Sequence, residues 1–373
     1  MNILILGWRD PRHPLAGGAE QVVHEHAKGW IRAGNKVTLF SSRFKNSRKK
    51  ETLDRVKIIR EGHQYLGVQI AAFLFYLNHK KDFDFIIDQF HGIPFFTPLY
   101  VRKPKVALIQ EVARNVWFLN PLPWPINLVV GILGFIVEPF IFFLYKNSQF
   151  ITGSQSAKKD VSKFGIPLKS ITVVPHGVIL PKFKVRTKKS RIKTITYLGV
   201  ISRDKGIEDA INAFAILNNN DNFRFWVVGK AEKKGYEKSV KHRVNKLGLT
   251  RKVKFWGFVD ANKKFELLAQ SHVLINPSIH EGWGLVNIEA NYVGTPTIVY
   301  NVSGSVDSVR DGQSGLICKQ NTPECLAENI SLLLADEKLY SKVQRGALNW
   351  AKNFSWRKSR KLSLELIERL AKS

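Results

Sequence analysis

The chain has 373 residues, which exceeds the size at which a single hydrophobic core usually stops growing, so we expect two domains. Hydrophobic residues make up 44% and charged residues 24%, without low-complexity tracts or short-period repeats, which excludes a disordered or solenoid protein. The formal net charge of +28, from 58 Lys and Arg against 30 Asp and Glu, indicates an anionic partner. This charge admits a nucleic acid, an anionic membrane surface or a phosphorylated substrate.

Cysteine content and the first residues bear on the compartment. Cys318 and Cys325 are too few for a disulfide framework and lack metal-ligand spacing, so we expect reduced thiols in the cytosol. The opening residues MNILILGW have no basic leader, and their apolar run is too short for a signal peptide. They predict the first strand of a cytoplasmic protein.

Apolar runs of strand length alternate with segments of helical period along most of the chain, which is typical of parallel α/β sheets. The predicted strands cover residues 3–6, 37–40, 85–87, 106–109, 194–198, 225–228, 253–255, 273–275 and 297–299. The rhythm breaks at residues 175–193, a segment that ends in a basic run, so we place domains over residues 1–180 and 181–355. Because open α/β sheets bind ligands at the carboxyl ends of their strands, we predict an active site in a cleft between the domains.

The stretch 126–145 is almost wholly apolar and nearly long enough to span a bilayer. Glu138 and Pro139 interrupt it, which argues against a membrane span. A buried helix and a helix lying at a bilayer surface both stay open. Together with Trp117, Phe118 and Trp124 and the excess of cations, the stretch predicts peripheral association with anionic membranes, where a lipid-linked acceptor would be natural.

The loop after the first predicted strand ends in Gly17-Gly18-Ala19-Glu20, directly before a helical segment. Glycines allow close backbone approach, and a helix N-terminus offers N–H groups and a partial positive charge, so this loop can cradle a phosphate. A Gly-Gly pair before a helix is also common in α/β proteins as a purely structural feature, and this alternative stays open.

Two cations follow the first strand of the predicted second domain, where residues 194–198 run into Gly199. Arg203 and Lys205 stand at the carboxyl end of this strand, placed to neutralise a departing nucleoside diphosphate. The alternative is an ordinary solvated loop in a basic chain.

Two carboxylates follow the predicted strand 273–275. Glu281 lies on the loop Ser278-Ile279-His280-Glu281-Gly282-Trp283-Gly284-Leu285, and Glu289 lies in the first turns of the next helix. Both can point toward one cleft and accept hydrogen bonds from sugar and ribose hydroxyls. Paired glutamates at a helix start can instead be favourable helix-dipole charges alone.

The order of these motifs resembles that of the retaining family 4 glycosyltransferases, also called glycosyl transferases group 1. The likeness covers nearly the whole chain and includes the family's two glutamates separated by seven residues, here Glu281 and Glu289. The other matching elements are Gly17-Gly18-Ala19-Glu20, Ser154-Gln155-Ser156, Pro175-His176-Gly177-Val178, Lys205-Gly206, Gly294-Thr295-Pro296, Gly304 and Asp311-Gly312-Gln313-Ser314-Gly315-Leu316.

The resemblance implies a GT-B fold: two Rossmann-like domains with a cleft between them and a C-terminal helix, here 356–373, that crosses back to the first domain. It implies that the second domain binds a nucleotide-sugar donor and the first binds the acceptor. Lys205 would contact the diphosphate, Glu281 the transferred sugar and Glu289 the ribose. The donor-binding set that it implies is Gly17, Gly18, Gly199, Lys205, Gly229, Glu281, Gly282, Gly284, Leu285, Val286 and Glu289.

Two positions depart from the family pattern. Many relatives place an arginine directly after the glycine that is here Gly199, whereas this chain has Val200, so Arg203 is the candidate for the second cation. Relatives often carry a histidine where this chain has Gln110, so either Gln110 orients the transferred sugar or another group, such as His91, replaces it. The candidate catalytic residues are therefore Glu281, Lys205, Arg203 and Gln110.

The resemblance predicts retaining transfer of a sugar from a nucleoside-diphosphate sugar to an acceptor hydroxyl, with neither metal nor another cofactor. The acceptor would be a glycan or lipid-linked. Three other interpretations stay open: a sugar-nucleotide epimerase or phosphorylase-like enzyme on the same fold, a silent glycan-binding relative and a nucleic-acid-binding protein. The last is disfavoured by the lack of a recognisable zinc-finger, RNA-recognition or helix-turn-helix signature, so we expect no nucleic acid partner.

Overall fold

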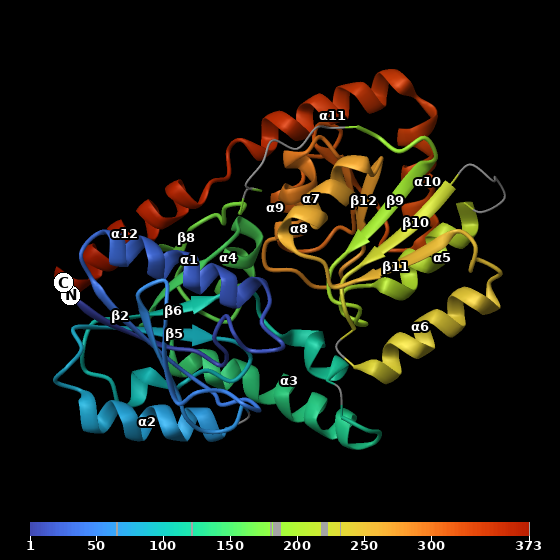
Figure 1. The fold of residues 1–373 in the computed structure, drawn as a ribbon. Helices are drawn as coiled ribbons and strands as arrows, with labels where there is room; N and C mark the ends of the chain where they lie inside the picture. The colour runs from blue at the N-terminus through green and yellow to red at the C-terminus, as the bar shows by residue number, and fades with distance from the viewer. Residues whose placement is uncertain are drawn as a thin grey trace. The chain divides into compact units, whose positions relative to one another are not determined.

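The computed structural model describes residues 1–64, 66–120, 122–179, 181, 188–217, 223–231 and 233–372 (Figure 1). These residues form two compact units, unit 1 over Met1–Gly177 with Ser355–Ser373 and unit 2 over Val178–Phe354. Each unit contains a sheet of parallel strands with helices, which confirms the predicted α/β class. The predicted boundary at residue 180 and residues 182–187 of the basic run lie outside the described residues.

The sheet of unit 1 has eight strands in the order β3-β4-β2-β1-β5-β6-β7-β8. The strands are β1 (Asn2–Leu6), β2 (Lys36–Ser41), β3 (Lys50–Leu53), β4 (Val56–Arg60), β5 (Phe85–Phe90), β6 (Lys105–Ile109), β7 (Gln149–Thr152) and β8 (Ile171–Val173). The edge strand β3 is antiparallel to β4, and the other pairs are parallel. The central strand β1 is buried on both faces, which explains its continuous apolar run.

The helices of unit 1 cover both faces of this sheet. They are α1 (Gly18–Arg32), α2 (Gly67–His79), α3 (Ile126–Leu144), α4 (Gln155–Ser162) and α12 (Trp356–Lys372), with the 3₁₀ turns η1 (Thr97–Leu99), η2 (Arg114–Leu119) and η3 (Leu168–Ser170). In β1, residues 3 and 5 join the core formed with α1 and α12, whereas residues 4 and 6 pack with α2. In β6, residues 106 and 108 belong to the first core and residues 107 and 109 pack with α3. Helices α2 and α3 therefore cover the same face.

The C-terminal helix α12 returns to unit 1, as predicted. Ser359 Oγ lies 3.0 Å from His26 Nε2, and Ser363 Oγ accepts a hydrogen bond from Trp30 Nε1 at 3.1 Å. Each bond joins residues 333 positions apart in the chain, and all four side chains are buried. Satisfied buried polar groups of this kind specify where the helix docks.

Unit 2 has a six-stranded parallel sheet in the order β11-β10-β9-β12-β13-β14. Its strands are β9 (Lys193–Leu198), β10 (Phe223–Val228), β11 (Val253–Gly257), β12 (Val273–Asn276), β13 (Thr297–Val299) and β14 (Gly315–Ile317). Its helices are α5 (Ile207–Leu217), α6 (Lys234–Lys246), α7 (Ala261–Gln270), α8 (Leu285–Tyr292), α9 (Ser305–Ser308), α10 (Pro323–Ala335) and α11 (Glu337–Ala351). All nine strands predicted from the sequence lie within observed strands, whereas β3, β4, β7, β8 and β14 were not predicted.

Helix α3 differs from the buried helix that was one of its two interpretations. By length and composition, α3 could cross a membrane: its most apolar 18-residue stretch has a mean hydropathy of 2.2. Only 22% of this stretch is buried in the protein. Trp117 and Phe118 of η2 pack onto it, since Cβ atoms on Gly134 and Gly131 would lie 2.3 and 2.6 Å from their rings. The outward side of α3 is left exposed and apolar.

The charge that interrupts the apolar stretch points into unit 1. Glu138 is 1% exposed, and its carboxylate accepts hydrogen bonds from the backbone N–H groups of Ala113 and Arg114 at 2.7 and 2.8 Å. It also accepts one from Trp117 Nε1 at 3.2 Å. The carboxylate therefore satisfies the start of η2, and it leaves no charge on the exposed side of α3 at this position.

Replacing this buried acceptor provides a test of the packing. Glu138→Leu leaves three partly buried N–H donors without their acceptor, so we expect the free energy of unfolding to fall by about 2 kcal/mol. Urea denaturation followed by circular dichroism measures it. The neighbouring Val137, which is 45% exposed, supplies the control Val137→Leu, with an expected change below about 0.5 kcal/mol. A gain in stability for Glu138→Leu would contradict the hydrogen bonds assigned to this carboxylate and would place residue 138 among apolar side chains.

Candidate active site

The strand order of unit 2 reverses between β9 and β12, the position where open α/β sheets bind ligands. The loops that leave these two strands bring together two predicted site residues. Lys205 Nζ lies 3.2 Å from Glu281 Oε2 and 3.5 Å from the His280 carbonyl oxygen. The Lys205 and Glu281 side chains are 27% and 18% exposed, so this ion pair is partly buried but open to a ligand.

Glycines allow the loops at this edge to touch. Gly206 has φ +68°, and a Cβ there would lie 2.0 Å from the Pro277 carbonyl oxygen. Gly229, after β10, has φ +136°, and its Cβ would lie 1.9 Å from the Gly199 carbonyl oxygen. Neither position has room for a side chain, so glycine is needed at both for the backbones to approach this closely. The approach brings the loop that carries Lys205 close to the loop after β12, and Gly229 close to Gly199.

A series of hydrogen-bonded polar side chains leads to Glu281 from the interior of unit 2. Ser278 Oγ lies 2.7 Å from Asn276 Oδ1 and 3.3 Å from Glu281 Oε2. Asn276 Nδ2 donates to Asn287 Oδ1 at 3.1 Å, and Asn287 Nδ2 donates to Ser308 Oγ at 2.9 Å. These four supporting residues are buried. Sequence reasoning missed them as a group, although polar residues at the end of a buried strand were a usable signal.

Helix α8 begins directly after the glutamate loop. Gly284 precedes it at φ +81°, and Leu285 and Val286 form its first turn. First-turn N–H groups of an α-helix have no acceptor within the helix, and they carry a partial positive charge. This part of unit 2 therefore combines Lys205 with a helix N-terminus, both suited to an anionic ligand.

Glu289 lies on α8 and is 5% exposed. Its Oε1 lies 2.5 Å from Lys264 Nζ of α7, so the structure pairs it with a cation that the sequence did not single out. The two predicted glutamates thus have separate cationic partners, Lys205 for Glu281 and Lys264 for Glu289.

Arg203, the candidate for the second cation, is exposed and makes no ion pair with any residue that the structure describes. Val200 is 44% exposed, and its carbonyl oxygen accepts a hydrogen bond from Tyr197 Oη at 2.6 Å. The exposed Arg203 stands in the turn that leads to Lys205.

In the glycine loop of unit 1, one backbone N–H group already donates to a side chain of the protein. The Gly17 N–H donates to Glu20 Oε2 at 2.7 Å, and Glu20 Oε1 accepts from Arg9 Nε at 2.9 Å. Glu20 is buried, so this arrangement caps α1 internally. Gly18, at the first position of α1, retains a first-turn N–H group for a ligand.

Gln110, at the end of β6, is bound to a histidine from another part of unit 1. Its Oε1 lies 2.7 Å from His176 Nε2, with the ring nitrogen as donor when the carboxamide oxygen faces it. The His176 ring stacks on Trp356 with centroids 6.2 Å apart. His91, the other candidate, contacts the Trp8 ring edge-on at 5.6 Å. The structure therefore gives Gln110 a positioning partner in His176, whose motif was noted but whose contact was not predicted.

Two buried histidines of unit 1 are held neutral. Burial lowers the pKa of His176 to about 3, with a contribution from the nearby His26, and burial lowers the pKa of His26 to about 4. A Cβ on Gly153 would lie 2.6 Å from His176 Nε2, so the ring is packed against the backbone. The neutral ring can keep one nitrogen as a donor to Gln110.

Comparison with known proteins identifies the family. Residues 16–180 match the family model for Glycosyltransferase Family 4, and residues 180–350 match that for Glycosyl transferases group 1. The chain therefore belongs to the group 1 glycosyltransferases of family 4, as its motif order predicted.

Individual relatives agree with this family. An uncharacterised glycosyltransferase of Methanocaldococcus jannaschii is 27% identical over 206 residues, a match that covers 52% of each chain. The chain spans about half the length of the first curated relatives that it matches.

Solved structures show the fold. Sucrose-phosphate synthase from Thermosynechococcus elongatus has a TM-score of 0.81 at 20% identity, covering 99% of this chain and 98% of that one. HepE from Anabaena, in complex with UDP and glucose, has a TM-score of 0.74 at 18% identity, covering 99% and 100%. The GT-B architecture expected from the motifs is thereby confirmed.

The buried histidines predict acid sensitivity of unit 1. Each is neutral when folded but takes up a proton on unfolding below its ordinary pKa of 6.5, so stability falls as the pH drops from 6.5 toward the folded values of about 4 and 3. We expect His176 to cost about 2 kcal/mol at pH 5. Denaturation at several pH values should show a shallower dependence for His176→Gln, with the exposed His242→Gln as control. Equal slopes for all three proteins would contradict the assignment.

Proposed function

We propose that this protein transfers a sugar from a nucleoside-diphosphate sugar to an acceptor hydroxyl, with retention of configuration and without a metal. The observation that carries the proposal is the Lys205–Glu281 pair at the strand-order reversal of unit 2. Lys205 lies in the loop after β9, and Glu281 lies in the loop that leads to the N-terminus of α8. Unit 2 would bind the donor and unit 1 the acceptor. The family and the UDP complexes of HepE support a nucleotide-sugar donor.

In the proposed reaction the acceptor oxygen attacks the anomeric carbon from the face that the diphosphate leaves. The bond from this carbon to the phosphate oxygen breaks as the new glycosidic bond forms, and the acceptor proton passes to the departing phosphate oxygen. Lys205, Arg203 and the first turn of α8 would stabilise the developing negative charge. Glu281 would accept hydrogen bonds from hydroxyls of the transferred sugar and so position it.

The acceptor would be a glycan or a lipid-linked molecule of the cell envelope. The exposed apolar side of α3 and the net charge of +28 support association with an anionic membrane surface. We therefore infer a protein of the cytoplasm that binds peripherally to the inner face of the membrane, with no nucleic acid as partner.

Lys205 and Glu289 are assigned to different parts of the donor, so substitutions at the two positions should change different quantities, kcat for Lys205 and nucleotide affinity for Glu289. Lys205→Ala removes charge facing the leaving diphosphate, so we expect kcat to fall by roughly 10²-fold or more, beyond any loss of donor affinity. Glu289→Gln weakens hydrogen bonds to the ribose, so free nucleotide should bind more weakly by about 1 to 3 kcal/mol. Steady-state kinetics and calorimetry with nucleotides give both quantities.

The ion pair with Lys264 calls for a control, because Glu289→Gln also weakens that pair. Lys264→Gln disturbs the same pair but leaves the proposed ribose acceptor in place. Nucleotide affinity should therefore fall clearly more for Glu289→Gln than for Lys264→Gln, in variants that remain folded. Unchanged turnover and nucleotide binding in both Lys205→Ala and Glu289→Gln would reject the assigned donor site.

Turnover should not need a divalent metal, because cationic side chains and a helix terminus are proposed to neutralise the leaving group. Activity after thorough treatment with a chelator should equal that of the untreated protein. Loss of turnover that magnesium or manganese restores would reject the proposed phosphate site.

A further inference from the structure

One edge of the unit 1 sheet has a basic face. In β2 and β4, the side chains of Val37, Leu39 and Ile58 are buried in the core with α1. On the other face, the same strands carry Lys36 and Lys57, and both are exposed. Because successive side chains of a strand alternate between faces, this edge presents cations on the face that α2 covers further along the sheet.

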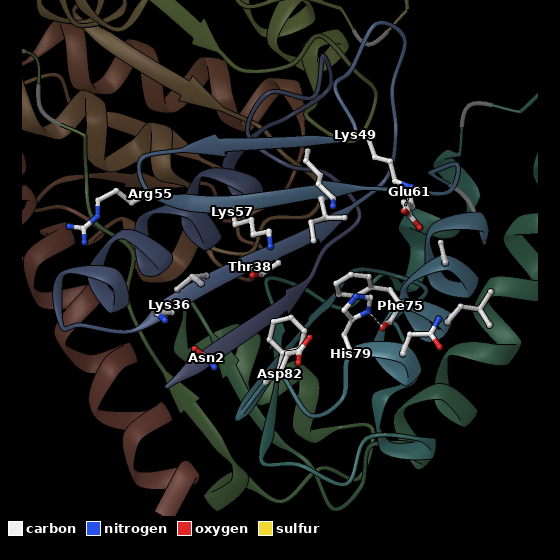
Figure 2. A pocket seen from close by; sticks show the side chains of 17 residues that line it. Asn2, Lys36, Thr38, Lys49, Arg55, Lys57, Glu61, Phe75, His79 and Asp82 are labelled. Carbon is white, nitrogen blue, oxygen red and sulfur yellow. Dashed lines mark hydrogen bonds and ion pairs between the residues drawn. The ribbon is translucent and has the colours of Figure 1, made fainter.

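A pocket of about 770 Å³ lies between this edge and α2 (Figure 2). Figure 2 shows Lys57 and Thr38 on the strand side, and Phe75 and His79 of α2 on the other. The cations that line the pocket are Lys36, Lys49, Lys50, Arg55 and Lys57, against the acids Glu61 and Asp82. Lys49 pairs with Glu61 at 2.7 Å, which leaves the cations in excess.

Of the described residues that line the pocket, none is assigned to catalysis or donor binding. Asn2 and Lys36 stand at the amino-terminal ends of β1 and β2, whereas Glu61 follows the carboxyl end of β4, so the lining runs along the strands. The glycine loop and Gln110 follow the carboxyl ends of β1 and β6. An anion held in the pocket would therefore be a separate ligand from the proposed substrates.

The outward side of α2 is apolar beside this basic pocket. Ile70, Phe73, Leu74 and Leu77 are 37% to 62% exposed, and Leu74 also lines the pocket. Helix α3 covers the same face of the sheet as α2 (Figure 1). It adds further exposed apolar side chains. These are Ile126, Leu128, Val129, Ile132, Leu133, Phe135, Ile136, Val137, Phe140, Phe143 and Leu144. So large an exposed apolar surface is typical of a membrane or protein contact.

More cations stand at the ends of these helices. Both helices connect parallel strands, so they run antiparallel to the strands and end at the amino-terminal edge of the sheet. Lys80 and Lys81 follow α2, and Lys146 follows α3, all exposed. The exposed Asp82 opposes them. An apolar surface bordered by cations matches a bilayer, whose interior takes the apolar side chains while anionic head groups meet the cations.

We infer that the basic pocket binds the phosphate group of an anionic lipid while the outward side chains of α2 and α3 enter the bilayer interface. The inference builds on the proposed membrane partner and assigns its contact to α2 and this pocket as well as to α3. A nucleic acid would match the cations but would leave the apolar surface in water. The bilayer accounts for both features with one occupant.

The test compares two triple variants of equal charge. Lys36→Gln, Lys50→Gln and Lys57→Gln remove three exposed cations of the pocket. The control variant carries Lys238→Gln, Lys246→Gln and Arg251→Gln, at residues that are also exposed and belong to unit 2. In sedimentation with vesicles of phosphatidylcholine and phosphatidylglycerol, the pocket variant should lose about 100-fold in partition constant and the control about 3-fold or less. Equal losses would overturn the pocket and leave only an effect of net charge.

A second pair of variants tests the apolar surface. Ile70→Gln with Leu74→Gln should clearly weaken the part of vesicle binding that persists in about 0.5 M NaCl, because salt screens charge but not apolar burial. The side chains of α3 would supply the binding that remains. Ile216→Gln with Leu332→Gln, at similarly exposed apolar residues of unit 2, should leave the salt-resistant binding unchanged. Loss in both double variants, or in neither, would overturn insertion by α2.

Competitors identify the source of the phosphate. Soluble glycerol 3-phosphate at millimolar concentration should not displace the protein from anionic vesicles. Release of the protein from the vesicles by glycerol 3-phosphate would indicate a site for free phosphate esters. Preferential binding of RNA that is lost in the pocket variant would indicate a nucleic acid as ligand. Either result overturns the lipid site. Thermal shifts with nucleotide sugars should be retained in the pocket variant. Their absence from the unaltered protein would reject the proposed enzyme but not the lipid site.

Discussion

The candidate site of unit 2 depends on one close approach of two backbones. Gly206 lies so near Pro277 that a Cβ would stand 2.0 Å from the carbonyl oxygen, which joins the loop after β9 to the loop after β12. The strand order reverses between these two neighbouring strands, so their loops leave the same edge of the sheet and turn in opposite directions along it. A cation from one loop thereby meets a carboxylate from the other, as Lys205 and Glu281 do at 3.2 Å.

Pairing of partly buried charges is the second constraint on this region. A charge removed from water is costly unless a counter-charge or hydrogen bonds compensate it. Glu289 has Lys264, and Glu281 has Lys205 together with the hydroxyl of Ser278. An anionic ligand that binds Lys205 must compete with Glu281, so the affinity of the site reflects an exchange of partners and not the simple addition of a contact.

In unit 1 the same rule decides what the apolar stretch becomes. Glu138 turns inward to accept three hydrogen bonds at the start of η2, and the small residues Gly131 and Gly134 admit the rings of η2. The charge that disfavours a membrane span in the sequence is therefore used for packing. The apolar side chains that remain outside form a surface together with α2, on one face of the sheet.

The sequence by itself determined the α/β class, nine strands and the candidate residues Lys205, Glu281 and Glu289, because strand periodicity and motif spacing are local properties of the chain. It could not pair Glu289 with Lys264, or Gln110 with His176. Nor could it show that α2 and the basic residues of β2 and β4 border one pocket. Only the tertiary structure decided these contacts, since strand order and helix packing bring together groups whose separation along the chain carries no signal.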